Sequence, residues 1–256
     1  MITMQEEIKD MAKDFIEEYK KINKIKTKWK ETIVAFANAK DPIFLQLKQA
    51  VNEDHKLPHE LLKNANSIIT FFVSFNKEVV LSNSNGINAS KEWAIAYIET
   101  NKLVSDLSRF LANSLNEKNY DCFEVPPILD FDKKKLMCYW SHKHVAYIAG
   151  LGKFGLHKLL ITEKGCCGRL GSLITSAKIE ATKRSEENYC LYFQNGSCTH
   201  CIDKCIFGVF NNDFFDRHKC YEICLKNGKF YSKLGPSDMC GKCACGVPCS
   251  LTNPCK

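Results

Sequence analysis

The sequence predicts an α+β protein with two parts, an α/β domain over residues 1–182 and a smaller, cysteine-rich domain over residues 183–256. Helix-like and strand-like segments follow one another through the first part. The fifteen cysteines are unevenly placed, since four come before residue 190 and eleven fall in the last 67 residues. The polar stretch 181–188 separates these two compositions, and we place the boundary within it.

Two helices of the first part are predicted from apolar spacing and capping. Near the N-terminus, apolar residues recur at helical spacing, namely Ile8, Met11, Phe15, Tyr19 and Ile22. A second helix is expected after Ser90, whose hydroxyl suits an N-cap. The apolar side of that helix includes Trp93, Tyr97, Val104, Leu107 and Leu111.

Strands are predicted where β-branched and aromatic residues cluster. Ser67–Phe75 is a nearly continuous apolar run, which is typical of a strand buried on both faces. A second strand is expected over 120–125, where two prolines follow. Residues 157–162 and 170–179 are expected to be strands on either side of a turn at 164–168, and 141–149 is expected to be helical.

Composition and charge limit the classes of function. The formal net charge is +7, and basic residues are interspersed with acidic ones, which gives little support for binding nucleic acid. The first residues are charged and no long apolar stretch follows, so we expect no signal peptide, no membrane span and a cytoplasmic location. Thiols stay reduced in that compartment, and fifteen cysteines therefore predict metal or cluster ligation instead of disulfides.

The spacing of the cysteines indicates iron–sulfur clusters. Cys198, Cys201 and Cys205 reproduce the last three positions of the C-x2-C-x2-C-x3-C-P run of bacterial two-cluster ferredoxins, whose fourth cysteine serves the other cluster. Asn195 stands where the first cysteine of that run would be, so we assign its role to Cys190. A later run, Cys240-x2-Cys243-x5-Cys249, supplies the remaining thiols together with Cys220.

Ferredoxin pairing divides these eight cysteines into two sets, each for one 4Fe–4S cluster. The first set is Cys190, Cys198, Cys201 and Cys249. The second set is Cys205, Cys220, Cys240 and Cys243. Cys224 remains an alternative to Cys220, and Cys245 an alternative to Cys243. Structural zinc is the less favoured alternative, because paired C-x2-C units also build zinc sites.

A glycine run precedes the cysteine-rich part. Gly150, Gly152 and Gly155 match G-x-G-x-x-G, but the expected order is helix before and strand after, the reverse of a dinucleotide-binding turn. We interpret the run as a place where the backbone approaches a ligand or a neighbouring element closely, which makes these glycines candidate cofactor-binding residues. The vicinal pair Cys166-Cys167 is interpreted as structural.

The order of these features resembles the epoxyqueuosine reductase family and, through it, the catalytic core of the reductive dehalogenases. The shared pattern is the run 149–152, a hairpin with the turn 165–168, and Gly196-Ser-Cys-Thr-His-Cys201 leading to Cys205. The resemblance covers about 65–256, and the segment 240–249 looks like the variant of short relatives from anaerobes. It implies a nitroreductase-like domain that binds cobalamin near the glycine run, and a ferredoxin-like domain whose two clusters pass electrons to the cobalt.

The resemblance further implies an oxidoreductase that takes electrons from a donor such as ferredoxin or flavodoxin, with tRNA as a conceivable substrate. It fails at the family's catalytic acid, because Leu136 occupies that position and Asp130, Asp132 and Tyr139 lie only nearby. We therefore assign no catalytic residue. The alternative function is an electron-transfer or reductive-activator protein without cobalamin, and a zinc-stabilised interaction module is less favoured.

Overall fold

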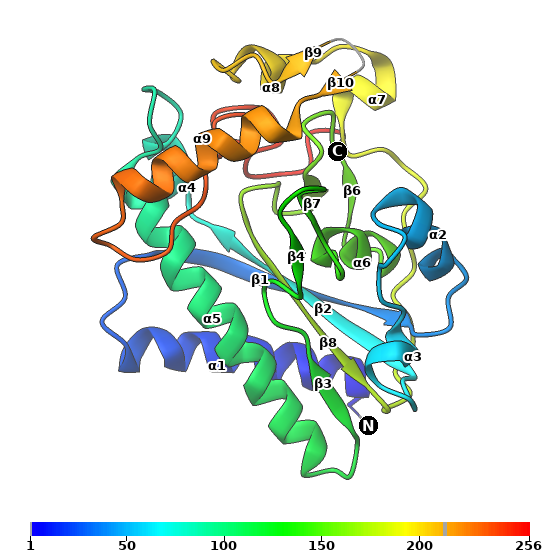
Figure 1. The fold of residues 1–256 in the computed structure, drawn as a ribbon. Coiled ribbons are helices and arrows are strands. Elements are labelled where there is room, and N and C mark those ends of the chain that lie inside the picture. Colours follow the sequence, from blue (N-terminus) through cyan, green and yellow to red (C-terminus); the bar gives the residue numbers. More distant parts are fainter. Residues whose placement is uncertain (1, 212–213) are drawn as a thin grey trace.

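A four-stranded antiparallel sheet forms the centre of the molecule (Figure 1). The computed structural model describes residues 2–211 and 214–256. The strand order is β1 (Trp29–Asn38), β2 (Ser67–Phe75), β8 (Gly168–Thr175) and β3 (Cys122–Glu124). All nine residues of β2 are buried, as its continuous apolar run predicts.

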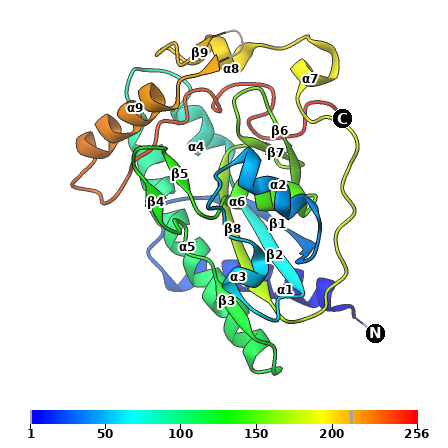
Figure 2. The ribbon, with the colours of Figure 1, turned by 45° about the vertical axis from the view of Figure 1, so that its right-hand side comes forward.

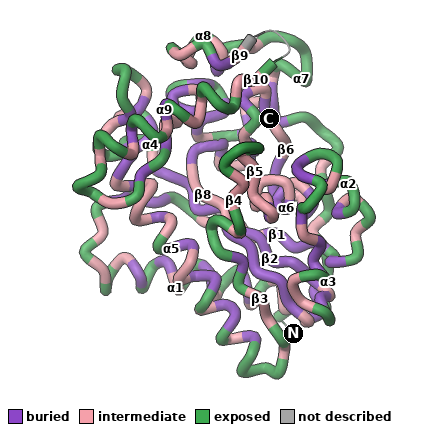
Figure 3. The backbone as a smooth tube through the Cα atoms, viewed as in Figure 1, coloured by how far each residue is buried: buried purple, intermediate pink, exposed green. Residues whose placement is uncertain are grey.

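Helices cover both faces of this sheet (Figures 1 and 2). The helices α1 (Met4–Ile22) and α5 (Lys91–Asn116) lie on one face. The other face carries α2 (Ile43–Ala50), α3 (Pro58–Leu61) and α6 (His142–Ile148). Side chains alternate along β2, so Phe71 packs into the core beneath α1 and α5 while Phe72 packs into the core beneath α2 and α6. Figure 3 shows this buried sheet between its more exposed helices.

The two helices predicted from apolar spacing are confirmed, and so is the predicted Ser90 cap. Thr3 and Glu6 form a capping box at the start of α1, and Ile8 and Tyr19 are buried. The Ser90 hydroxyl accepts a hydrogen bond of 3.1 Å from the Trp93 amide at the start of α5. The predicted helix over 141–149 is also confirmed, as α6.

Three predicted strands differ from the structure in their bounds. The strand expected over 120–125 is β3, which runs only from Cys122 to Glu124. The strand expected over 157–162 is β7 (Leu160–Thr162), because 155–159 form the turn of a hairpin with β6 (Gly152–Phe154). The strand expected over 170–179 is β8, which ends at Thr175. The chain then leaves the sheet, and the Ile179 amide donates to the Ser67 hydroxyl instead of to a strand.

Short elements and loops complete the fold. Before the cysteine-rich part these are α4 (Lys77–Ser82), β4 (Phe131–Asp132) and β5 (Met137–Cys138), of which the two strands form a hairpin. Within that part they are α7 (Leu191–Asn195), α8 (His200–Asp203), β9 (Phe210–Asn211), β10 (Phe214–Phe215) and α9 (Arg217–Phe230). Among the described residues, no helix is both long enough and apolar enough to span a membrane.

The cysteine-rich part packs against one end of the sheet, where β2 ends and β8 begins (Figures 1 and 2). Met239, Cys245 and Val247 belong to the same buried cluster as residues of α1 and α5. The two parts therefore share one hydrophobic core, and the boundary between residues 182 and 183 stays a prediction.

Candidate metal centre

The first predicted set of cysteines lines one small cavity. Cys190 directly precedes α7, Cys201 lies on α8, and Cys198 and Cys249 come from loops, yet all four border the same space. Apolar side chains complete the lining, namely Leu156, Leu191, Val247, Pro248 and Pro254, together with His157. The cavity measures about 20 Å³, so the side chains must spread apart to admit a cluster.

The pKa of Cys201 reflects this crowding of thiols. Burial raises it to about 12, and the neighbouring Cys249, Cys190 and Cys198 sulfurs add to the rise. A thiol in such surroundings resists ionisation until a cation arrives, because a thiolate would face both desolvation and like charge. Metal binding reverses that balance, since a coordinated thiol is deprotonated.

The second predicted set lines a larger cavity of about 310 Å³. Its cysteines are Cys205, Cys220, Cys240 and Cys243, joined by Cys224 and Cys166. Burial, first of all, and then the Cys240, Cys205 and Cys220 thiols raise the pKa of Cys243. Aromatic side chains form much of the remaining wall, including Phe75, Trp93, Tyr97, Phe207, Phe210 and Phe215.

The turn that carries Cys240 and Cys243 depends on Gly241. This glycine has φ +77°, a conformation that side chains with a Cβ rarely adopt. A Cβ at this position would also lie 2.5 Å from the Trp93 ring of α5. The turn is therefore pressed against α5, which fixes both cysteines relative to the sheet.

The sequence leaves two ligand choices open, Cys220 or Cys224 and Cys243 or Cys245, and the placement of these residues narrows only the second. Cys220 and Cys224 lie one turn apart on α9 and both line the second cavity, and a hydrogen bond from Cys224 lowers the pKa of Cys220 to about 7. Cys245 lines neither cavity; it is fully buried, and its sulfur lies 3.5 Å from the Asn83 amide nitrogen. This placement favours Cys243 over Cys245 and leaves both Cys220 and Cys224 as candidates.

Further thiols adjoin the first set without being part of it. The Cys166 and Cys167 amides donate to the carbonyls of Cys249 and Ser250, so the vicinal pair fastens the C-terminal loop to the start of β8. The Cys166 sulfur also lies within 4.8 Å of the Cys249 sulfur and of a His157 ring nitrogen. The pKa of Cys255 is raised by burial and by Cys190 and Cys249.

Backbone conformation or close packing favours glycine at each position of the glycine run, apart from any role in binding a cofactor. Gly150 has φ +76° directly after α6, and a Cβ on Gly152 would collide with the Ile161 carbonyl across the β6–β7 hairpin. A Cβ on Gly155 would lie 2.6 Å from the His157 ring. None of these glycines lines either cysteine cavity, and their role in binding a cofactor stays a prediction.

The segment ahead of the glycine run is held by internal hydrogen bonds. The Asp132 carboxylate accepts from the Lys134 and Lys135 amides, which stabilises the turn of the β4–β5 hairpin and lowers the pKa of Asp132. His142 bonds the Ser172 hydroxyl and the Pro126 carbonyl, and burial lowers its pKa to about 4. The Phe131 ring packs against Tyr221 of α9, so this hairpin adjoins the helix that carries Cys220.

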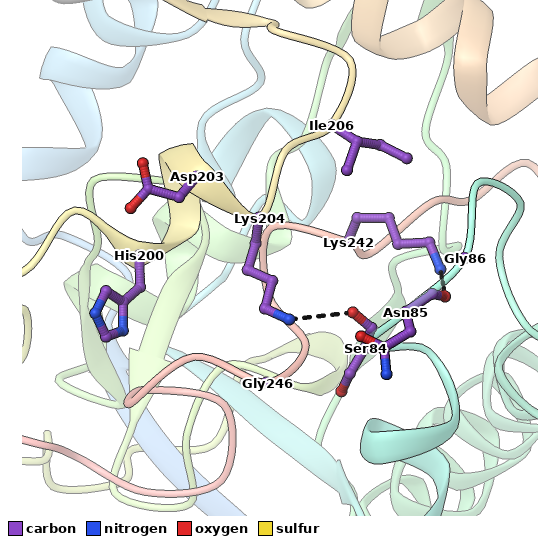
Figure 4. Close-up of a pocket in the computed structure, with 9 residues that line it drawn as sticks. All are labelled: Ser84, Asn85, Gly86, His200, Asp203, Lys204, Ile206, Lys242 and Gly246. Atoms are coloured by element: carbon purple, nitrogen blue, oxygen red, sulfur yellow. Dashed lines mark hydrogen bonds between the residues drawn. The ribbon is translucent and has the colours of Figure 1, made fainter.

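A larger recess of about 630 Å³ lies between the loop after α4 and the cysteine-rich segment (Figure 4). It is bordered by the loop after α4, by α8 and by the turns at Lys242 and Gly246. Lys204 donates to the Ser84 carbonyl (3.3 Å) and Lys242 to the Asn85 carbonyl (2.5 Å), so both ammonium groups are engaged by the backbone. No predicted cluster cysteine lines this recess.

Comparison with known proteins gives matches among solved structures alone, since no family profile and no curated protein matches. An epoxyqueuosine reductase from Streptococcus thermophilus is 18% identical, with a TM-score of 0.61 over 99% of this chain and 68% of that one. The enzyme from Bacillus subtilis is also 18% identical, with a TM-score of 0.55 over 92% and 64%. A catabolic reductive dehalogenase is 14% identical, with a TM-score of 0.58 over 86% and 30%.

The chain thus spans about two thirds of the length of the reductases and less than a third of the dehalogenase. At these identities the likeness is one of fold. It extends through both parts of the chain, from the helices of the first part to the cysteine-rich segment. This chain has the fold of the epoxyqueuosine reductases and reductive dehalogenases, the two groups that its sequence resembles.

Proposed function

We propose that this chain is an iron–sulfur oxidoreductase with two 4Fe–4S clusters that deliver low-potential electrons to a cofactor or substrate in the first part of the chain. One observation carries the proposal: the eight cysteines gather at two cavities in the same two sets that ferredoxin pairing predicts. Local spacing alone does not require this, because each set combines thiols from 190–220 with thiols from 240–249.

The residues around the cavities suit anionic clusters. Besides the cysteines, most of the lining side chains are apolar or aromatic, which limits contact with water, one of the factors that set cluster potentials. Lys242, between Cys240 and Cys243, is only 3% exposed and is held by the Asn83 and Asn85 carbonyls. A buried ammonium is costly without a compensating charge, and an anionic cluster on the flanking cysteines supplies one.

Cobalamin is the cofactor that the resemblance implies, and one similar solved structure is described as suggesting a mechanism for B12-dependent dehalogenation. When bound, a corrin supplies a cobalt centre that accepts electrons and reacts with substrate. The second cavity, at about 310 Å³, is at the lower limit of ordinary small-molecule sites. It does not fit a corrin in addition to a cluster, and we derive no step through cobalamin.

That limited space favours a second candidate, an electron-transfer or reductive-activator protein in which the two clusters serve a partner. Both candidates need an electron donor such as ferredoxin or flavodoxin, and both suit a cytoplasmic protein. One similar reductase was solved with a tRNA stem loop, so transfer RNA is a substrate to test for the first candidate only.

Anaerobic reconstitution of the full chain with iron, sulfide and cobalamin tests the proposal and separates the two candidates. We expect about eight iron atoms per chain and a broad visible absorption, and Cys190→Ser should remove about half of the iron. Four or fewer irons in fully reconstituted protein contradict the two ligand sets. A corrin spectrum that survives desalting supports the cobalamin enzyme, and its loss from protein with both clusters supports the electron carrier.

A further inference from the structure

Among the described residues, His157 alone lines the cavities of both proposed cluster sites. It lies at the tip of the β6–β7 hairpin, is only 3% exposed, and lines the first cavity as well as the second. Its Nε2 atom lies 3.3 Å from the sulfur of Cys249, a ligand of the first set. That separation suits a hydrogen bond to sulfur.

The other ring nitrogen identifies the donor in this contact. The Leu159 amide donates to Nδ1 of His157 at 3.2 Å. A backbone amide can only donate, so Nδ1 accepts and carries no proton. In the neutral ring the proton is then on Nε2, which points it at the Cys249 sulfur. The hairpin turn thereby selects the tautomer that donates to the cysteine.

The backbone of the hairpin turn restricts the His157 ring to its position beside the Cys249 sulfur. Gly155 leaves room for it, since a Cβ there would lie 2.6 Å from the ring carbon Cε1. The Gly155 amide donates to the Leu159 carbonyl (2.9 Å), which closes the turn around His157. The ring therefore has little freedom to leave the sulfur.

We propose that His157 is a positioning residue that donates an N–H···S hydrogen bond to the ligand Cys249 and raises the reduction potential of the first cluster relative to the second. The inference rests on the proposed function, because Cys249 must be a cluster ligand. Reduction adds negative charge to the cluster and its sulfurs, and a donor to sulfur stabilises that reduced state more than the oxidised one. An outer hydrogen bond of this kind is a recognised way to tune a metal centre.

Redox titration of the reconstituted full chain, followed by electron paramagnetic resonance, tests this role. In His157→Leu we expect one midpoint potential to become more negative, the other to stay unchanged, and the iron content to remain at the wild-type level. In His157→Gln the side-chain amide can still donate, so we expect a smaller shift. His200→Leu is the matched control, because His200 is exposed at the start of α8, between Cys198 and Cys201, and the substitution should leave both potentials unchanged.

Unchanged potentials in a fully loaded His157→Leu protein overturn the inference. Loss of about four irons in both His157 variants also overturns it, because His157 would then be a ligand or a purely structural residue. Wild-type protein without two clusters overturns the proposed function itself, which iron analysis reveals before any potential is measured.

If His157→Leu fails to fold, wild-type protein labelled with nitrogen-15 histidine provides the test. We expect hyperfine coupling from one histidine nitrogen to the reduced first cluster. Its absence overturns the inference.

Discussion

Cys220 and Cys224 show how close two candidate ligands can lie. They face the same cavity from successive turns of α9, and the thiol of one donates to the sulfur of the other. The lowered pKa of Cys220 means that its thiolate is the better stabilised of the two, whereas the pKa of Cys224 is raised by the same contact and by burial. Because a cluster binds the thiolate, this contact favours Cys220 as the ligand and Cys224 as its hydrogen-bond donor.

We therefore predict that Cys220→Ser lowers the iron content of reconstituted protein by about four atoms, while Cys224→Ser leaves it at the wild-type level. Iron and sulfide analysis after desalting gives the numbers. Equal losses in the two variants would mean that both thiols are needed, and a loss confined to Cys224→Ser would reverse the assignment.

A second prediction concerns His142, whose pKa is lowered from 6.5 to about 4 by burial. The unfolded chain binds a proton near pH 6.5, and the folded chain does so only near pH 4. The stabilising contribution is therefore complete above pH 6.5 and is lost as pH falls from 6.5 toward 4. We expect the free energy of unfolding to fall by about 1–3 kcal/mol over this range because of His142.

Urea unfolding of the wild type and of His142→Gln between pH 4 and 7 measures this contribution. The variant should lose part of the pH dependence, and the exposed His59→Gln should retain all of it. His144, whose pKa is also lowered to about 4, accounts for part of what remains. An identical slope in His142→Gln and wild type would contradict the prediction.

The β6–β7 hairpin is the element that links the first part of the chain to the cysteine site. It depends on Gly152, where any Cβ would collide with the Ile161 carbonyl of the opposite strand. We predict that Gly152→Ala lowers the free energy of unfolding by about 3 kcal/mol or more, because the strands must separate. Thermal or urea unfolding measures this loss.

Gly196→Ala is the matched control for that substitution. Gly196 has φ +76° but open space around it, so only the backbone conformation is strained and a cost of about 1–2 kcal/mol is expected. A smaller loss for Gly152→Ala than for Gly196→Ala would show that the hairpin tolerates a wider separation of its strands.

Among the elements, the sequence predicted those with a strong local signal. Ser67–Phe75 is a strand with the predicted bounds, because its continuous apolar run shows no helical periodicity that would compete with a strand. β1 was missed, since the charged residues at its start, from Lys30 to Glu31, interrupt the pattern and its strand character is completed by pairing with β2. β6 was missed because glycine disfavours strands, and here the close approach of the partner strand requires Gly152.

The candidate site was predictable to the extent that ligand spacing is local. Cys198, Cys201 and Cys205 are recognisable from their spacing, and the partners from 240–249 follow from the pairing rule. His157 was treated only as part of a strand, because a single histidine has no spacing signal. Its significance comes from a hairpin turn and a sulfur 92 positions away in sequence.

At the scale of the whole molecule, the shared hydrophobic core couples cluster binding to the stability of the folded chain. Cys190, Cys201, Cys245 and Cys249 belong to the same buried cluster as the helices α1 and α5. We predict that protein without clusters unfolds at a lower temperature than reconstituted protein, because a ligand that binds only the folded state stabilises it. Differential scanning calorimetry under anaerobic conditions measures both states.

Cys198→Ser should then unfold at an intermediate temperature, because it retains the second cluster. The exposed Ser197→Ala is the neighbouring control and should unfold with the wild type. Equal unfolding temperatures with and without clusters would mean that the core is complete without them.

The division of each ligand set between 190–220 and 240–249 also has a consequence for biosynthesis. A ribosome that has made the first part and the segment up to Cys220 has produced only incomplete sites, since neither cavity exists before Cys240, Cys243 and Cys249 emerge. Under the proposed pairing, iron is therefore inserted after translation has passed residue 249. Until then the segment that completes both cavities is missing from the end of the sheet, and the thiols already synthesised belong to no complete site.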